Sequence, residues 1–309
     1  MSESESGREP QPLEWRLRSI VGEDNVLVDE PMSEHTTFKV GGPADLYVIP
    51  ESFDEVRDVL LACDEAGVER FVLGRGSDLL VSDDGYRGVI VAVGEGLMGV
   101  SVDGMEMTCQ AGVDLREASE MACELGLSGL EFACGIPGSV GGACFMNAGA
   151  YGGCVADALK CVRVLMPDGT QETIGVDELD LGYRRSRVAA DGLVVLSATF
   201  ALEKGDPEKI RATMDDLTRQ REEKQPLEMA SAGSTFKRPE GYFAGKLIMD
   251  AGLQGYRVGG AEVSRKHAGF VVNTGGATAA DVHAVIEHVQ DEVERQFGVR
   301  LEPEVRFLG

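Results

Sequence analysis

Apolar residues recur at helical spacing in several stretches of the chain, and these stretches predict its helices. Residues 53–66 carry apolar side chains three and four positions apart and stop before Gly67, a residue type that often follows a helix. In residues 278–297 an apolar stripe runs from Val282 to Val293, so one face of that helix is expected in a core. Further helices are expected at residues 114–125, 205–224 and 242–252.

Shorter apolar runs and alternating segments predict strands between these helices. Alternation around Asp103-Gly104 and around Asp168-Gly169 predicts hairpins at 99–111 and 162–173, because Asp-Gly favours a tight hairpin turn. Strands interleaved with helices in this way indicate an α+β fold. The remaining strands are expected at residues 70–73, 88–93, 269–273 and 299–309.

The length of 309 residues points to two domains, at roughly 150 residues each. The charged helix predicted at 205–224 has a proline near each end, which makes it the best candidate for their junction. Residues 1–20 are expected to be a disordered acidic tail, without the apolar core of a signal peptide. The division is therefore this tail, a first domain at 21–204 and a second domain at 205–309.

The balance of charged residues limits the partners of the chain. Lys and Arg number 29 against 53 Asp and Glu, for a formal net charge of −24. A protein this acidic is a poor binder of nucleic acid or of an anionic membrane, because it repels their phosphates. No apolar run approaches the roughly 18 residues of a membrane span. The seven cysteines form no Cys-x-x-Cys pair, so we expect no metal site and reduced, buried thiols in a cytoplasmic protein.

Glycine is enriched to 40 residues, and much of the excess lies in two loops, residues 72–80 and 134–153. Consecutive backbone N–H groups in such loops form concave nests that bind pyrophosphate without a cation, although purely structural turns explain the glycines equally well. The first loop begins like a dinucleotide fingerprint at Gly74-Arg75-Gly76 but lacks the third glycine and the helix that should follow. A Rossmann site is therefore not supported.

The charge reverses within one window, residues 231–270, which holds six Lys or Arg against three Asp or Glu. Together with Arg184, Arg185 and Arg187 this basic window would make an anion site. Charge alone favours the other interpretation, a solvated basic face.

Seven segments of the chain match one known pattern in order, over nearly the whole chain from His35. The segments are HTTFKVGGPAD (35–45), VLGRGSDLLVSDDGYRG (72–88), GIPGSVGGACFMNAGAYGG (135–153), GYRRSR (182–187), AGSTFKRP (232–239), AGKLIMDAGLQGYRVGGAEVSRKHAGFVVN (244–273) and LEPEVRFLG (301–309). With these segments the chain resembles a family of flavoenzymes, the UDP-N-acetylenolpyruvoylglucosamine reductases, in their shorter type without an inserted subdomain. These NADPH-dependent oxidoreductases make UDP-N-acetylmuramate for peptidoglycan, the wall polymer that cell shape and division require.

The resemblance implies a fold and a set of ligands. We expect a vanillyl-alcohol-oxidase-type (PCMH-type) FAD-binding domain of two α+β subdomains within residues 21–204, with its core at 35–200. The smaller α+β domain at 205–309 would bind the substrate, UDP-N-acetylglucosamine enolpyruvate. FAD is expected to be bound non-covalently, NADPH to be the co-substrate and the chain to be a monomer.

In such a protein the two glycine-rich loops would cradle the flavin cofactor. Where the family usually has Asn, this chain has Asp78, whose ionised carboxylate would repel a pyrophosphate unless it turned away or capped backbone N–H groups. The cofactor-binding residues implied are Gly74, Arg75, Gly76, Ser77, Asp78, Leu79, Gly135, Ile136, Pro137, Gly138, Ser139, Gly141, Gly142, Asn147, Ala148 and Gly149.

Three more positions match the family's catalytic residues. Reducing a vinyl ether that carries a carboxylate needs hydride at the CH₂ carbon, a cation at the carboxylate and a proton donor for the second carbon. By resemblance Arg184 would bind the carboxylate, Ser234 would donate the proton, and Glu304 would assist as a protonated donor or an orienting group. Without the family pattern these are a surface charge, a turn serine and a solvent-facing carboxylate. The substrate-binding residues implied are Tyr183, Lys237, Arg238 and His267.

Two other functions stay open at the level of the sequence. One is another FAD-dependent oxidoreductase of the same superfamily, acting on an alcohol or a sugar, although no His or Cys is placed for covalent flavin attachment. The other is a non-catalytic nucleotide-sugar binder, which would be expected to lose Arg184, Ser234 or Glu304.

Overall fold

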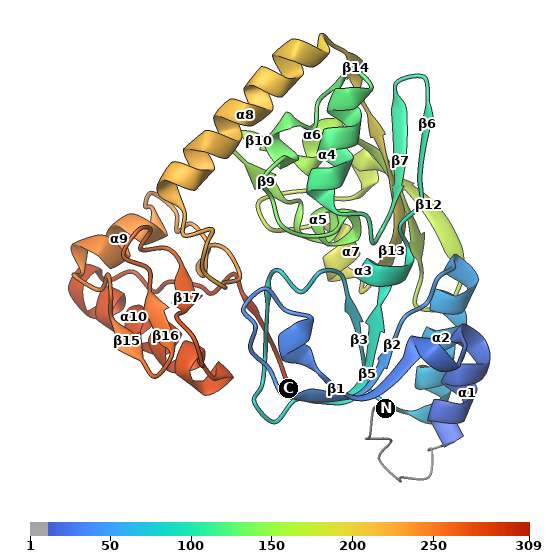
Figure 1. Ribbon diagram of the computed structural model, residues 1–309, viewed down its shortest axis with the longest axis horizontal. Helices are drawn as coiled ribbons and strands as arrows, with labels where there is room; N and C mark the ends of the chain where they lie inside the picture. Colours follow the sequence, from blue (N-terminus) through green and yellow to red (C-terminus); the bar gives the residue numbers. More distant parts are fainter. Residues whose placement is uncertain (1–11) are drawn as a thin grey trace, which may run out of the picture.

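The described part of the chain, residues 12–309 of this computed structural model, begins with a small sheet covered by helices (Figure 1, blue to cyan). The strand order is β1-β2-β5-β3, with β1 antiparallel to β2 and the other pairs parallel. The elements are α1 (Pro12–Val21), β1 (Val26–Pro31), β2 (Pro43–Val48), α2 (Phe53–Ala66), β3 (Arg70–Leu73), β4 (Leu79–Val81) and β5 (Tyr86–Ala92), with 3-10 turns η1 (Glu23–Asn25) and η2 (Met32–Glu34).

The helix predicted at 53–66 is confirmed as α2, and an unpredicted helix precedes it. Ser52 accepts a hydrogen bond from Glu55 N in the first turn of α2, and Gly67 ends the helix at φ 63°. Helix α1 lies where the sequence predicted a disordered tail up to residue 20, so that prediction is wrong from Pro12 on. Leu17 of α1 is fully buried in the core shared with α2, and this tertiary packing orders a segment whose own pattern is weak. Residues 1–11 lie outside the described residues.

The second unit is a five-stranded antiparallel sheet in the order β12-β11-β13-β7-β6 (Figure 1, green to yellow). Both predicted hairpins are confirmed, with Asp103 opposite Glu106 and Leu165 opposite Gln171. One buried core reaches from Val59 in the first unit to the strands of the second, so the two units form the pair of α+β subdomains expected. The elements are α3 (Val93–Gly96), β6 (Val100–Asp103), β7 (Glu106–Gln110), α4 (Leu115–Glu124), β8 (Leu127–Ser128), η3 (Glu131–Ala133), α5 (Val140–Met146), β9 (Gly149–Ala150), β10 (Gly153–Cys154), α6 (Val155–Ala158), β11 (Leu159–Leu165), β12 (Gln171–Gly175), η4 (Val176–Glu178), α7 (Arg187–Ala190), β13 (Val194–Ala201) and β14 (Glu203–Lys204).

The charged helix α8 (Pro207–Lys224) leads away from these subdomains to the C-terminal unit (Figure 1, gold). Ile210 and Met214 of α8 are buried against Cys123 and Cys134, so its inner face packs on α4 and η3. The domain boundary at 204/205 stays a prediction, and this packing favours a boundary after α8 over one before it.

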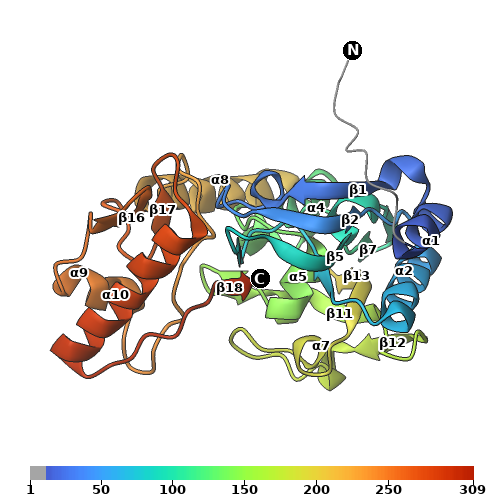
Figure 2. The same ribbon diagram turned by 90° about the horizontal axis from the view of Figure 1, so that it is seen from below.

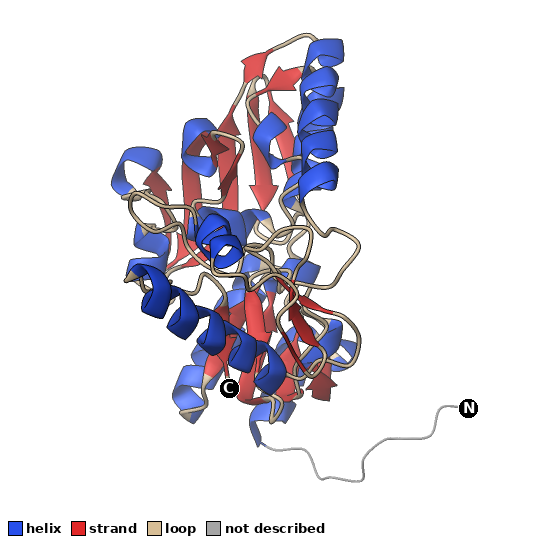
Figure 3. Cartoon of the chain, turned by 90° about the vertical axis from the view of Figure 1, so that its left-hand side faces the viewer, coloured by secondary structure: helices blue, strands red, loops and turns tan. Residues whose placement is uncertain are grey.

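The C-terminal unit has its own core under a three-stranded sheet, β15-β16-β17 (Figure 1, orange to red). The long helix predicted at 278–297 is confirmed as α10, and its apolar stripe from Val282 to Val293 is buried. In Figure 3 the strands of the two larger sheets run along the length of the molecule, with helices beside them and in front of them. The elements are α9 (Ala244–Asp250), β15 (Arg257–Val258), β16 (Ala261–Val263), β17 (Val271–Asn273), α10 (Ala279–Phe297) and β18 (Arg306–Leu308).

The terminal strand predicted at 299–309 is wrong for most of its length. Only β18 forms, and it pairs in parallel with β4 of the first subdomain (Figure 2). Residues 299–305 instead span the gap between the two units, with Leu301 and Val305 buried in the C-terminal core. Their alternation therefore reflects burial of a crossing segment, and Pro303 lacks the N–H that a continuous ladder would need.

The described part of the chain contains no helix that is both long and apolar enough to cross a bilayer.

The two units are also joined at the start of α10. Asp83, from the turn after β4, accepts hydrogen bonds from Ala279 N at 2.7 Å and Ala280 N at 2.9 Å. These are first-turn N–H groups that the helix itself cannot satisfy, and a carboxylate there also interacts favourably with the helix dipole.

We predict that Asp83→Ala lowers the free energy of unfolding by about 1–2 kcal/mol, as loss of a helix cap does. Denaturant titration of the whole chain measures this change. Asp84→Ala is the matched control, because the neighbouring carboxylate is exposed and makes no hydrogen bond with the described residues. Equal losses in the two variants would contradict a capping role for Asp83.

Candidate active site

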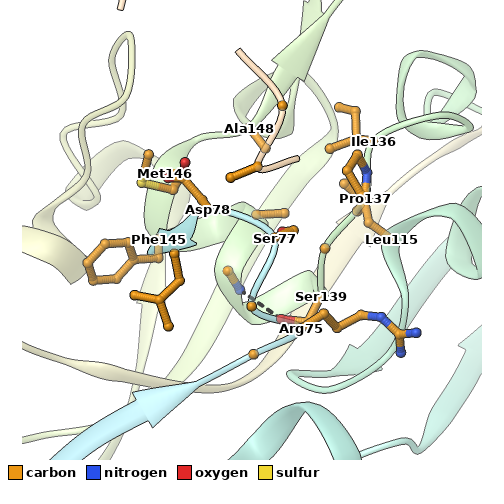
Figure 4. Close-up of a pocket in the computed structure, with 18 of the residues that line it drawn as sticks. Arg75, Ser77, Asp78, Leu115, Ile136, Pro137, Ser139, Phe145, Met146 and Ala148 are labelled. Atoms are coloured by element: carbon orange, nitrogen blue, oxygen red, sulfur yellow. Dashed lines mark hydrogen bonds between the residues drawn. The ribbon is translucent and has the colours of Figure 1, made fainter. Parts of the chain in front are cut away.

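A cavity of about 680 Å³ lies where the two subdomains meet the C-terminal unit. Pockets of this size hold cofactors and substrates. Its wall contains both glycine-rich segments, and Figure 4 shows Ser77 and Asp78 of the first facing the same space as Ile136, Pro137 and Ser139 of the second. Most of the predicted cofactor residues line it, namely Gly74, Arg75, Gly76, Ser77, Asp78, Leu79, Ile136, Pro137, Gly138, Ser139, Gly141, Gly142, Ala148 and Gly149.

The first loop offers a row of free backbone donors. Within the described residues, none of the five N–H groups from Gly74 to Asp78 donates a hydrogen bond to a protein acceptor. Gly76 has φ 59°, and a Cβ there would lie 2.0 Å from His35 O, so only glycine can hold this turn against the preceding segment. The loop therefore has the free, concave backbone expected of an anion-binding nest.

The second segment is not the open loop that its glycines suggested. Ser139 caps a short helix, α5, by accepting from Gly142 N at 3.2 Å, and Gly141 N donates to Ala111 O at 2.9 Å. The glycines serve close packing, because a Cβ on Gly141 would lie 2.9 Å from Ala111 Cβ and a Cβ on Gly74 would lie 2.4 Å from Ser139 Oγ. The N–H groups of Gly141 and Gly142 are thus occupied within the protein, whereas those of Gly138 and Ser139 donate to no acceptor among the described residues and remain available to a ligand in the cavity.

Helix α5 also positions the turn that carries Arg184. Asn147, which ends α5 at φ 44°, donates from Nδ2 to Gly182 O at 3.1 Å, and Ser186 Oγ donates to Phe145 O at 2.6 Å. Arg184 itself has φ 52°, a conformation that non-glycine residues adopt only when their surroundings hold them there. Asn147 and Gly135 do not line the cavity, and Asn147 supports it through its contact with Gly182.

Arg184, Ser234 and Glu304 meet at one end of the cavity, although 120 residues of sequence separate the first from the last. Arg184 Nε lies 2.5 Å from Glu304 Oε1, and both side chains are largely buried. The N–H bond of Nε is poorly directed, so this contact is an ion pair without a good hydrogen bond. Ser234 is exposed to the cavity.

Thr235, a residue that the sequence did not single out, holds these groups together. It is fully buried, and its carbonyl accepts from Glu304 N at 2.8 Å. Its own N–H donates to Gly269 O, and its Oγ1 accepts from Val271 N at 2.9 Å. Ser234 and Glu304 are therefore fixed to β17 through one threonine.

Burial raises the pKa of two carboxyls at this end of the cavity. Burial raises the pKa of Glu304, and the adjacent Arg184 opposes that rise. Burial and the charge of Glu304 raise the pKa of Asp78 to about 7. Burial lowers the pKa of His267, which lines the cavity and accepts from Gly269 N through Nδ1 at 3.2 Å.

The other three predicted substrate residues stand outside the lining. Tyr183 is 61% exposed, and its hydroxyl accepts from Arg238 N at 3.0 Å. The Arg238 guanidinium lies 4.0 Å from the ring centroid of Phe243, and Lys237 forms an ion pair with Glu302. These side chains form an outer group beside the cavity.

The basic window does not form the anion site considered from the sequence. Lys246 pairs with Asp250 and Arg265 with Glu262 on neighbouring turns, and Arg257 donates to Gly259 O. These three side chains have local partners and are not among the residues that line the cavity, so the solvated-face interpretation describes them better.

Two cations that the sequence did not single out line the cavity instead. Arg221 and Lys224, one turn apart at the end of α8, form no ion pair with a described residue. Burial lowers the pKa of Arg221, whose Nε donates to Gln225 Oε1 at 2.9 Å. A desolvated guanidinium without a carboxylate partner favours binding an anion. In the sequence these two cations are interspersed with the acidic residues of α8, so they do not stand out as a basic patch.

Within the described residues no group of three His, Cys, Asp or Glu is arranged to hold a metal ion, and all seven cysteines are free thiols.

Comparison with known proteins agrees with this architecture. A family model described as an FAD binding domain matches residues 44–175, and the C-terminal domain model of UDP-N-acetylenolpyruvoylglucosamine reductase matches residues 225–308. The chain is 51% identical to the UDP-N-acetylenolpyruvoylglucosamine reductase of Clostridium perfringens, over 95% of this chain and 96% of that one. It is 52% identical to the Geobacillus thermodenitrificans enzyme of the same name, with the same coverage.

Solved structures give the same result. The crystal structure of UDP-N-acetylenolpyruvylglucosamine reductase from Thermus caldophilus has a TM-score of 0.79 and 35% identity, covering 92% of this chain and 98% of that one. An alkyldihydroxyacetonephosphate synthase has a TM-score of 0.50 and 16% identity over 65% of this chain and 42% of its own, a likeness of fold alone.

The first loop depends on Gly76 for its shape. We predict that Gly76→Ala lowers the free energy of unfolding by more than about 3 kcal/mol, because left-handed backbone strain adds to a clash with the backbone of His35. Denaturant titration measures the loss. Gly104→Ala is the matched control: its φ of 62° is the same, but a Cβ there meets nothing within 4 Å.

We expect the control to lose only about 1 kcal/mol, the cost of the backbone conformation. Similar losses in both variants would mean that the first loop does not rest on His35 as described.

Proposed function

The chain belongs to the UDP-N-acetylenolpyruvoylglucosamine reductase family, and we propose that Arg184, Ser234 and Glu304 carry out its reaction. The protein is an FAD-dependent oxidoreductase that uses NADPH to reduce UDP-N-acetylglucosamine enolpyruvate to UDP-N-acetylmuramate for peptidoglycan. The observation that carries the residue assignment is the meeting of these three side chains in one cavity. Neither another oxidoreductase nor a non-catalytic binder accounts for relatives of that name at about half identity over the whole chain.

The cavity suits the flavin cofactor. Free N–H groups from Gly74 to Asp78 would hold the pyrophosphate, which explains how a chain with a net charge of −24 binds it without a cluster of cations. When bound, FAD supplies the hydride that originates in NADPH and ends on the CH₂ carbon of the enolpyruvyl group. Every other step that we propose belongs to side chains of this protein.

Arg184 and Glu304 act on the substrate carboxylate. Addition of hydride to the CH₂ carbon leaves negative charge on the neighbouring carbon, which the carboxylate delocalises. With Nε occupied by Glu304, the Nη groups of Arg184 remain to bind this carboxylate in a buried site, where a charge-assisted contact is strong. Glu304 orients the guanidinium.

Ser234 supplies the proton to that neighbouring carbon. A serine hydroxyl is a weak acid, so it transfers its proton only to a strongly basic centre such as this carbanion-like intermediate. Its exposure to the cavity and its fixed place beside Thr235 support this role.

Arg221 and Lys224 would bind the diphosphate of the nucleotide sugar. Both side chains line the cavity at the C-terminal end of α8, and neither forms an ion pair with a described residue. We also propose that the protein is cytoplasmic and works as a monomer. Its seven free thiols support the first proposal.

We predict that Ser234→Ala leaves reduction of the flavin by NADPH unchanged and slows its reoxidation by the enolpyruvyl substrate roughly 10²- to 10⁴-fold, the range of general acid catalysis. Anaerobic stopped-flow absorbance follows both half-reactions. Ser231→Ala is the control, since Ser231 is three residues away and does not line the cavity. Equal slowing of both half-reactions would exclude Ser234 as the proton donor.

We predict that Arg221→Met combined with Lys224→Met weakens binding of the UDP-sugar roughly 10- to 100-fold, the loss expected for a charge-assisted contact. Calorimetric titration at several salt concentrations should also give a smaller salt dependence than in the wild type. Arg219→Met is the control, because Arg219 on the same helix pairs with Asp216 and Glu223 in solvent. An unchanged salt dependence would contradict this diphosphate site.

A further inference from the structure

One carboxyl in the cavity wall has an oxygen without a partner. Asp78 lies directly before β4, and its Oδ2 is excluded from solvent. No group of the described residues donates a hydrogen bond to this oxygen. An ionised carboxylate in that position would lack the donors that make burial of a charge tolerable.

The groups that face Asp78 do not provide such donors. Its carbonyl accepts from Arg306 N at 3.1 Å, so the segment that contains Glu304 lies against it. The charge of Glu304 disfavours ionisation of Asp78, and the charges of Arg184, Arg306 and Lys237 favour it. None of these cations forms an ion pair with the Asp78 carboxyl, because each of them is held by other groups.

Each of the three cations is engaged elsewhere. Arg184 contacts Glu304, and Lys237 contacts Glu302. The Arg306 guanidinium lies between two rings, 5.5 Å from the centroid of Phe71 and 4.9 Å from that of Phe145. Of the two buried carboxyls, Glu304 contacts a guanidinium, that of Arg184. Asp78 has no cation in contact with its carboxyl among the described residues. Two such groups do not both ionise easily, so the one without the cation keeps a proton.

We propose that Asp78 is a positioning residue for Glu304: Asp78 stays protonated in the cavity wall, so that Glu304 remains the ionised carboxylate paired with Arg184. This inference rests on the proposed roles of Arg184 and Glu304. When Asp78 ionises, this proton is lost and a second negative charge appears near Arg184. Arg184 then attracts the substrate carboxylate less, so the reaction slows.

The sign of the pH effect follows from the shift. The pKa of Asp78 lies near 7 in the folded protein, against 3.8 for an unperturbed Asp. Between these values the folded chain holds a proton that the unfolded chain has lost. Stability contributed by the protonated group is therefore complete below about pH 4 and is lost as pH rises to about 7. Asparagine keeps the size and a hydrogen-bond donor but does not titrate.

The test compares Asp78→Asn with the wild-type holoenzyme from pH 5 to pH 9. Asp84→Asn is the matched control, because it removes the same charge from an exposed position six residues away. We expect the melting temperature of Asp78→Asn, relative to wild type, to rise steadily from pH 5 to pH 8. The control should show no such trend.

The rate of flavin reoxidation by the enolpyruvyl substrate should show the same dependence. In the wild type it is expected to fall up to tenfold per pH unit above about pH 7, the limiting slope for loss of one proton. In Asp78→Asn it should be flat over this range. The conservative variant thereby restores activity at high pH, which a merely structural role would not produce.

A melting-temperature difference that does not change with pH would overturn the proposal. So would an Asp78→Asn enzyme that is slow at every pH, because Asp78 would then act in its ionised form. Glu304→Gln separates this inference from the proposed function. If that variant reoxidises its flavin at the wild-type rate, the catalytic role of Glu304 fails, while the melting-temperature trend still reports on the proton of Asp78.

Discussion

The parallel pairing of β18 with β4 is the contact on which the site depends. It brings the last residues of the chain back to the first subdomain, and Glu304 lies just before it. The same crossing segment is tied to Ser234 through Thr235, which links it in turn to β17. Arg184 reaches this point from the other side, on a turn held by α5. A reaction that needs cofactor, cation and proton donor within a few ångströms is thus built from segments far apart in sequence, and the terminal strand closes it.

Local fields explain how so acidic a chain takes up anionic ligands. The net charge of −24 describes the solvated surface, where ion pairs are screened and neutralised by their neighbours. The cavity uses other means: free backbone N–H groups in the loop after β3, and the half-buried Arg221, which lacks a carboxylate partner among the described residues. Both act with little competition from water, so a few donors suffice where the whole-chain charge is unfavourable.

The sequence predicted features that are determined within one element better than features that depend on residues far apart in the chain. Helices α2 and α10 and the two Asp-Gly hairpins follow from spacing and caps within one element, and all were found. Helix α5 was missed because Gly141 and Gly142 disfavour a helix locally, while close contact with Ala111 requires them there. The strand expected at 299–309 forms only as β18, because the residues before it cross between the two units instead of joining a ladder. Arg184, Ser234 and Glu304 came only from resemblance, since no periodicity connects residues from three segments. Arg221 and Lys224 lie outside the family segments, and Thr235 lies within one of them but was not singled out; the roles of all three were found only in the fold.

The most direct test of this account is a crystal structure of the oxidised holoenzyme with UDP-N-acetylglucosamine enolpyruvate. We predict the pyrophosphate of FAD on the N–H groups from Gly74 to Asp78, the enolpyruvyl carboxylate on Arg184, and Ser234 Oγ in contact with the carbon that bears this carboxylate. The UDP diphosphate should lie on Arg221 and Lys224. A substrate carboxylate bound away from Arg184, or a diphosphate held by the cations of the basic window instead, would contradict it.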